Sequence, residues 1–157
     1  MAFTITRLDA KFPEPEFSAL RRVVFAQVAE ELVGWTSGWA ERGNLFYMAG
    51  SGVHPEHRRR GIYSALLEAA IGHAAASGAQ VVRSQHSVLN NPVLIAKLKR
   101  GFQVSGLSSS AQMGTLVELT LHLSMQREAL WRSRAIPLME PATVGQPPGS
   151  NVRSEGA

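Results

Sequence analysis

The stretch from residue 52 to residue 67 decides the fold, and it reads Gly52-Val53-His54-Pro55-Glu56-His57-Arg58-Arg59-Arg60-Gly61-Ile62-Tyr63-Ser64-Ala65-Leu66-Leu67. An apolar segment leads into a basic loop, and the loop opens a segment whose apolar residues have helical spacing. The N–H groups at the start of a helix are unpaired and carry partial positive charge, so they bind phosphate. The arginines at 58–60 add charge-assisted hydrogen bonds, and Gly61 lets the backbone approach a ligand. The stretch therefore predicts a phosphate-bearing ligand at a helix start.

The same loop has simpler interpretations. A solvated loop with Gly61 as a turn residue needs no ligand, and this interpretation is favoured for an isolated run of three arginines. The strand before the loop and the Ala-rich helix after it favour ligand binding instead. No Gly-Lys-Ser/Thr follows, so the loop is not a Walker phosphate loop, and the dinucleotide fingerprint lacks two of its three glycines.

The composition is that of one small globular domain. The chain has 157 residues, of which 45% are hydrophobic and 18% charged, a balance that excludes a disordered chain. It has no cysteine, which excludes a disulfide scaffold, a thiolate metal site and a cysteine nucleophile; no metal site is predicted. The formal charge is +4, and 13 of the 16 basic residues are arginine. This charge is compatible with nucleic acid, an acidic membrane surface or a phosphorylated ligand as partner.

Neither a membrane segment nor a secretory signal is predicted. No apolar run approaches the roughly 20 residues that cross a bilayer. Residues 1–11 lack a basic segment followed by an apolar run. We therefore expect a cytoplasmic protein that does not insert into a membrane.

Apolar spacing divides the chain into strands and helices. Period-two alternation or β-rich composition predicts strands at 3–8, 32–40, 45–53, 80–86, 102–107 and 114–123. Helical spacing predicts helices at 16–31, 62–76, 93–100 and 125–133. A polar turn at 41–44 joins two of these strands into a hairpin. The strands at 45–53 and 80–86 flank one helix, and such a βαβ unit predicts that they lie parallel.

Two segments in register resemble a known family. Arg58-Arg59-Arg60-Gly61-Ile62-Tyr63 resembles the Arg/Gln-x-x-Gly-x-Gly/Ala signature of the GCN5-related N-acetyltransferases (GNAT). Val53-His54-Pro55-Glu56-His57-Arg58 matches the Val-x-Pro-x-x-Arg lead-in that is usual there. The stretch from Asn90-Asn91-Pro92 to Gly101-Phe102 resembles the family's Asn-x-Pro…Gly-Phe segment. The resemblance covers residues 3 to about 123.

The resemblance implies an α/β fold: a single domain with a mixed, centrally splayed β-sheet flanked by helices. We expect this domain over residues 1–136 and a disordered tail over 137–157, where Pro, Gly and small polar residues dominate. The resemblance also implies acetyl-CoA as the acetyl donor, held by the loop that binds its pyrophosphate and by an asparagine. Carried over by position, the residues that bind it are Gly52, Val53, Arg58, Arg59, Arg60, Gly61, Ile62, Tyr63 and Asn90.

Two positions depart from the family pattern. Tyr63 stands where Gly or Ala is typical, so its ring must lie away from the pyrophosphate or the loop must change shape. Lys97 stands seven residues after Asn90, where the family often has a tyrosine that protonates the leaving thiolate. Lys97 could act as a cationic donor to that thiolate or bind a CoA phosphate. Alternatively, Lys97 and Lys99 form a solvated helix face.

The reaction that the resemblance implies is direct transfer of acetyl from acetyl-CoA to an amine. Backbone N–H groups around Gly52 and Val53 would polarise the thioester carbonyl in the gap between the two parallel strands. Because the chain has no cysteine, the acetyl group cannot pass through a thioester on the protein, which also favours direct transfer.

The incoming ammonium must lose a proton, so a base is needed. The candidates are His86, His54 and Glu56. His86 is expected at the end of the second parallel strand, where the gap opens, and a histidine titrates near neutral pH. Ser84 lies two residues earlier and therefore points to the same face of the sheet. The candidate catalytic residues are His86, Lys97 and Ser84.

Two further functions compete with an acetyltransferase. One is a GNAT-like protein that binds CoA without catalysis. The departures from the family pattern at Tyr63 and Lys97 would be the sequence features that indicate it. A basic nucleic-acid-binding module is the other. We predict no nucleic-acid partner, because the arginine cluster is confined to one loop and no aromatic–basic interleaving or zinc-finger signature is present. The expected partners are acetyl-CoA and an amine-bearing acceptor of unidentified class, and a homodimer is in keeping with the family.

Overall fold

One mixed β-sheet carries the fold in the computed structural model, which describes residues 2–10 and 21–135. The strands are β1 (Thr4–Ala10), β2 (Arg21–Val28), β3 (Glu31–Glu41), β4 (Leu45–Val53), β5 (Val81–Ser87), β6 (Gln103–Ser110) and β7 (Gly114–His122). The helices are α1 (Ile62–Ala76), α2 (Asn91–Lys99) and α3 (Met125–Ala135), and a short 3₁₀ turn, η1, covers Pro55–His57.

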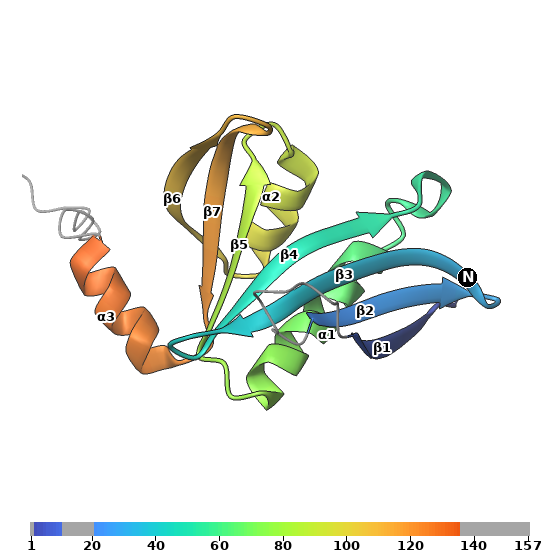
Figure 1. Cartoon of the computed structure of the whole chain (residues 1–157), viewed down its shortest axis with the longest axis horizontal. Helices are drawn as coiled ribbons and strands as arrows, with labels where there is room; N and C mark the ends of the chain where they lie inside the picture. Colours follow the sequence, from blue (N-terminus) through green and yellow to red (C-terminus); the bar gives the residue numbers. More distant parts are fainter. Residues whose placement is uncertain (1, 11–20, 136–157) are drawn as a thin grey trace, which may run out of the picture.

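The seven strands lie in the order β1-β2-β3-β4-β5-β7-β6. All neighbours run antiparallel except β4 and β5, which run parallel as the βαβ pattern predicts. The parallel pair is short, because only Leu45–Met48 pairs with Val81–Ser84. Beyond these residues the two strands diverge, and the sheet opens into two arms, β1–β4 on one side and β5, β7 and β6 on the other (Figure 1). This is the centrally splayed α/β sheet that the family resemblance implies.

Helix α1 packs across the arm formed by β1–β4. Its Ile62 and Leu66 join one core cluster with Val24, Ala26 and Val33. Other buried residues of α1 join a second cluster with residues of β4, β5 and β7. This second cluster consists of Phe46, Met48, Leu67, Ala70, Ile71, Ala74, Val82, Phe102, Val117 and Leu119. Burial of large apolar side chains of this kind contributes about 1.5–3 kcal/mol each. The helix is thereby fixed with its first turn at the open end of β4.

The helix predicted at 16–31 is wrong over the described residues, because β2 occupies Arg21–Val28. Val24 and Val28 have helical spacing, but Val24 and Ala26 are the pair that is buried, at the period-two spacing of a strand. Pairing with β1 on one side and β3 on the other overrides the local pattern. Ala29 and Glu30 form the tight turn to β3 with φ of 47° and 71°, and no Asn-Gly or Asp-Gly signals it.

The other predicted elements are confirmed within a few residues: the hairpin of β3 and β4, helix α1, strand β5, helix α2, strands β6 and β7, and helix α3. The expected tail at 137–157 and the first five residues of the expected helix lie outside the described residues. In the described part of the chain, none of the helices is long and apolar enough to cross a membrane.

Gly38 is the position of the hairpin where a side chain fits worst. A Cβ at Gly38 would lie 2.3 Å from the carbonyl oxygen of Tyr47 and 2.6 Å from Cε1 of Phe46. Since both atoms belong to a packed strand, we expect Gly38→Ala to lower the free energy of unfolding by about 1–3 kcal/mol, measured by chemical denaturation. Gly72→Ala is the matched control: its Cβ would meet nothing within 4 Å, and the helix should gain on the order of 1 kcal/mol. Equal effects of the two substitutions would contradict the packing argument.

Candidate active site

The gap between β4 and β5 begins at a β-bulge. The β3–β4 register passes from Ser37 opposite Gly50 to Gly38 opposite Met48, which leaves Ala49 as the extra residue. Among the described residues of β5, none pairs with β4 beyond Met48. Backbone groups of β4 that face the gap can therefore bind a ligand, and bulges of this kind occur frequently beside active sites.

The predicted N–H donors lie in this segment. Gly52 and Val53 pair on their other side with Trp35 and Gly34 of β3, so that side of the segment is held in the sheet. Sequence reasoning missed the bulge at Ala49, although the signal was present: isolated glycines in a strand, here Gly50 and Gly52, frequently mark a bulge or a close backbone approach.

Lys97 lies at the apex of the gap, where β4 and β5 part. Its side chain is only 1% exposed. Its Nζ donates a hydrogen bond to Ser84 Oγ at 2.6 Å and contacts Met48 Sδ at 3.7 Å, and these two residues form the last paired step of β4 and β5. The ammonium also lies 4.8 Å from the centre of the Phe102 ring. The alternative of a solvated helix face is thus excluded for Lys97, whereas Lys99 is exposed.

Burial changes the protonation of Lys97. Because the charged form is poorly solvated there, burial lowers the pKa of Lys97 to about 7. Among the described residues, no carboxylate forms an ion pair with it. A lysine in this condition can both donate and accept a proton near neutral pH, which is the property required of a catalytic acid or base.

His86 and Ser84 lie on the same face, as their spacing predicts. His86 Nε2 is 3.2 Å from Ser84 Oγ, and Ser84 is fully buried. Burial, with the charge of Lys97 as the second cause, lowers the pKa of His86 to about 4. His86 is therefore neutral near pH 7, and with Nε2 unprotonated it accepts the hydroxyl hydrogen of Ser84. The three side chains form a hydrogen-bonded chain from Lys97 through Ser84 to His86.

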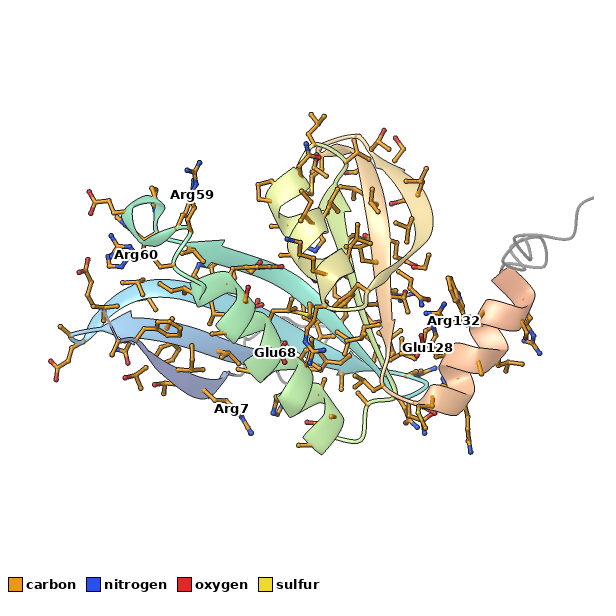
Figure 2. All side chains as sticks on the ribbon, turned by 180° about the vertical axis from the view of Figure 1, so that it is seen from behind. Arg7, Arg59, Arg60, Glu68, Glu128 and Arg132 are labelled. Carbon is orange, nitrogen blue, oxygen red and sulfur yellow. The ribbon has the colours of Figure 1, made fainter. Side chains whose placement is uncertain are left out.

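The basic loop joins the open end of β4 to α1. Arg58, Arg59 and Arg60 are exposed, and Figure 2 shows Arg59 and Arg60 extending to different sides of the loop. Arg58 Nε donates to the carbonyl oxygen of Val53 at 3.2 Å, which holds the loop against the strand. Gly61 is the N-cap of α1 with φ of 80°, and a Cβ there would meet nothing within 4 Å. Its left-handed backbone, rather than crowding, therefore explains the glycine.

The first N–H groups of α1 include those of Ile62 and Tyr63, and helix starts leave such groups without an intrahelical partner. The Tyr63 ring packs inward against the second core cluster, away from the exposed loop. A ring at this position of the family signature is thereby kept clear of the loop expected to bind the pyrophosphate. Burial raises the pKa of Tyr63 to about 12, an effect that nearby Ser51 partly offsets. The Tyr63 hydroxyl is buried and has no hydrogen-bond partner of good geometry among the described residues.

Asn90 is the N-cap residue of α2, with Pro92 in the first turn. Its side chain is exposed and makes no capping hydrogen bond. The amide is thus available to a ligand. His54 and Glu56, the other candidate bases, are exposed residues of the loop and are not part of the Lys97 chain.

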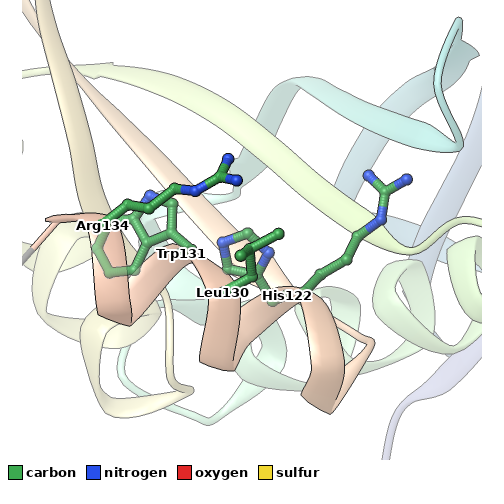
Figure 3. Close-up of a pocket in the computed structure, with 5 residues that line it drawn as sticks. His122, Leu130, Trp131 and Arg134 are labelled. Atoms are coloured by element: carbon green, nitrogen blue, oxygen red, sulfur yellow. The ribbon is translucent and has the colours of Figure 1, made fainter.

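A separate pocket of about 480 Å³ lies between β7 and α3 (Figure 3). Its lining consists of His122, Arg127, Leu130, Trp131 and Arg134. The rings of His122 and Trp131 are 5.8 Å apart, and neither ring nitrogen of His122 has a hydrogen-bond partner among the described residues. His122 pairs with Val81 at the start of β5, so this pocket lies at the closed end of the strands, opposite the gap.

Comparisons with known proteins agree with this geometry. Residues 2–102 match the model of the acetyltransferase (GNAT) family. A search of curated proteins finds no match. The IAA acetyltransferase from Bacillus cereus ATCC 14579 superposes with a TM-score of 0.68 at 15% identity, over 78% of this chain and 100% of that one.

Two further solved structures are similar. A GNAT family acetyltransferase from Elizabethkingia anophelis with acetyl-CoA bound has a TM-score of 0.66 at 15% identity, over 77% of this chain and 98% of that one. The ribosomal-protein-S18-alanine N-acetyltransferase from Escherichia coli has a TM-score of 0.65 at 14% identity, over 79% and 96%. At sequence identities of 14–15%, the similarity to these structures shows a shared fold.

Proposed function

The chain belongs to the GNAT acetyltransferase family, and on that premise we propose that it transfers an acetyl group from acetyl-CoA directly to an amine. The observation that carries the proposal is the buried chain of Lys97, Ser84 and His86 at the apex of the gap. The lysine at one end of this chain has a pKa of about 7. A buried lysine without an ion-pair partner destabilises the fold, so a role in chemistry is the better explanation of its presence.

The residues around the gap suit acetyl-CoA as donor. When bound, acetyl-CoA supplies an acetyl group activated as a thioester. The exposed arginines at 58–60 and the first N–H groups of α1 would hold its pyrophosphate. The exposed Asn90 amide is a polar group that its arm could satisfy. Tyr63 replaces a small residue of the family signature, and its inward packing leaves the loop itself clear.

We assign the proton chemistry to Lys97 in the first place. Protonated Lys97 can donate to the leaving sulfur, since its Nζ lies at the apex where β4 and β5 separate. The backbone N–H groups of β4 that face the gap would stabilise the negative charge on the acetyl oxygen. His86, with a pKa of about 4, is a weak base toward an ammonium. We therefore propose that His86 positions the Ser84 hydroxyl, which in turn holds Lys97.

Gly61→Asp should weaken acetyl-CoA binding about tenfold or more, because it adds a negative charge at the helix start and strains a left-handed backbone. Isothermal titration calorimetry with acetyl-CoA measures the effect. Gly43→Asp is the matched control: Gly43 also has a positive φ, of 79°, and open space around its Cβ, but it lies in the β3–β4 turn. Equal affinities for both variants would remove the loop from the proposed site.

Binding and catalysis are separate questions for this protein. Absence of acetyl-CoA binding at millimolar concentration would overturn the proposed function. Binding without CoA release, across a set of primary amines in a thiol assay, would instead favour the CoA-binding protein without catalysis.

A further inference from the structure

An exposed tryptophan lies flat against the bulged strand at the gap. Gly34 faces α1, since a Cβ there would meet Ile62 and Leu66 at 3.1 Å, so the next residue, Trp35, points to the opposite face of the sheet. A Cβ at Gly50 would lie 3.2 Å from the Trp35 ring, and a Cβ at Gly52 would lie 3.0 Å from its Nε1. The indole therefore leans from β3 across the two glycines of β4. At 41% exposure it presents a broad aromatic surface.

A carboxylate lies on this same face, one strand beyond β5, the strand that borders the gap opposite β4. Ser84 and His86 point to the face covered by the helices, so Gln85 between them points to the face of Trp35. Glu118 of β7 stands opposite Gln85 in the register, and Gln85 Nε2 donates to its Oε2 at 3.5 Å. The Glu118 carboxylate thus leans toward β5, and its side chain is 24% exposed.

Arg83 does not fully neutralise the charge of the Glu118 carboxylate. Its guanidinium lies 3.3 Å from Glu41 and 3.9 Å from Glu118, so the closer ion pair is the one with Glu41. Ser105 Oγ donates to the second oxygen of Glu118 at 3.1 Å. Oε2 of Glu118 is left with only long contacts, to Gln85 and Arg83, so it is the oxygen that faces β5.

Among the described strands, β4 and β5 are not paired beyond Met48 and Ser84. On the helix side the apex is closed by the buried Lys97 and Ser84. On the other side, the Trp35 indole of β3 covers β4, and the Glu118 carboxylate of β7 leans toward β5. On this second face an amine meets an aromatic surface over β4, next to the bulge at Ala49, and a negative charge that leans toward β5 from β7.

We propose that the acceptor is a small arylalkylamine, whose ring stacks on Trp35 and whose ammonium is held by Glu118. This inference rests on the proposed function and names the substrate class of the same site. Aromatic rings stack favourably, and a carboxylate attracts an ammonium. In the transfer the amine nitrogen bonds to the acetyl carbon and the carbon–sulfur bond breaks. The ammonium first releases one proton to solvent, so that the neutral amine attacks. Lys97 protonates the leaving thiolate, and the second proton that the nitrogen loses returns to Lys97 through solvent, so the net products are the amide, CoA and one released proton.

The spacing of the strand limits the length of this acceptor. Gly50 directly follows the bulge residue Ala49, and residues of a strand advance by roughly 3.3 Å each. An acceptor ring would stack on the outer face of the indole that covers Gly50 and Gly52, and a flexible linker must carry its nitrogen down to the apex. The probe is 2-phenylethylamine, which joins ring and nitrogen through two carbons.

The test compares 2-phenylethylamine with 2-cyclohexylethylamine, which has a similar size and charge but no aromatic ring. In a thiol-release assay we expect the wild-type protein to show a KM about three- to tenfold lower for the aromatic amine. Trp35→Ala should abolish this preference and Trp35→Phe should keep most of it. Glu118→Gln should raise KM for both amines about tenfold, and all three variants should bind acetyl-CoA as the wild type does in calorimetry.

A binding measurement covers the case in which neither amine is acetylated. The chain has 3 tryptophans, so Trp39→Phe with Trp131→Phe leaves Trp35 as the only one. We expect 2-phenylethylamine to quench its fluorescence saturably in the presence of CoA.

The outcomes separate the two proposals. No saturable quenching, or an unchanged aromatic preference in Trp35→Ala, overturns the arylalkylamine acceptor even if acetyl-CoA binds and amines are acetylated. Failure to bind acetyl-CoA overturns the proposed function itself, and the acceptor inference with it.

Discussion

Lys97→Met is expected to lower kcat for acetyl transfer by about 10²–10⁴-fold, the range for losing a general acid or base. Methionine has a similar length and apolar stem but cannot donate a proton. The affinity for acetyl-CoA should stay within a few-fold, because Lys97 is 1% exposed and its ammonium is bonded to Ser84. Steady-state kinetics with a released-thiol assay, together with calorimetry, measures the two quantities separately.

Lys99→Met is the control for this substitution, since Lys99 lies on the same helix and is exposed. It should leave kcat unchanged. Wild-type kcat should also fall as the pH rises through the pKa of Lys97, about 7, because only the protonated form donates; Lys97→Met should lack this descending limb. A variant with unchanged kcat but weakened acetyl-CoA affinity would instead support the alternative in which Lys97 binds a CoA phosphate.

The sequence predicts those elements whose signals are local. The Ala-rich helix α1 occupies the predicted residues, because its apolar spacing and the adjacent Gly61 act within a few residues of chain. The β3–β4 hairpin and the parallel pairing of β4 and β5 follow from a turn signal and from the order of strand, helix and strand. Ser84 and His86 share a face for the same local reason, the period of two along a strand.

Features set by distant partners are not predictable in this way. Strand β2 carries a spacing compatible with a helix, and only its two neighbouring strands decide against one. The sequence pattern of α2 does not distinguish its buried lysine from its exposed one. Lys97 is buried because Met48, Ser84 and Phe102 pack around its ammonium, and these three residues come from other segments of the chain. The pairing of Trp35 with Gly50 and Gly52 likewise depends on the register between two strands.

Lys97→Met is also expected to raise the stability of the protein below neutral pH, by an amount on the order of a few kcal/mol. The folded protein holds Lys97 with a pKa of about 7, against an ordinary value of 10.5. Below pH 7 the lysine is charged in both states, and the folded state bears the whole desolvation penalty. Between pH 7 and 10.5 the unfolded chain binds a proton that the folded protein does not, so wild-type stability rises with pH.

The variant carries no such group, so its advantage over the wild type should shrink as the pH increases from about 6 to about 10. Urea denaturation of both proteins across that range measures it, with Lys99→Met as the control. Ser84 keeps His86 as a partner after the substitution, so loss of the lysine leaves no buried hydroxyl unpaired. An advantage that does not change with pH would show that Lys97 keeps an ordinary pKa in the folded protein. A substitution that stabilises the fold and abolishes turnover would show that Lys97 is present for chemistry, since burying its charge opposes folding.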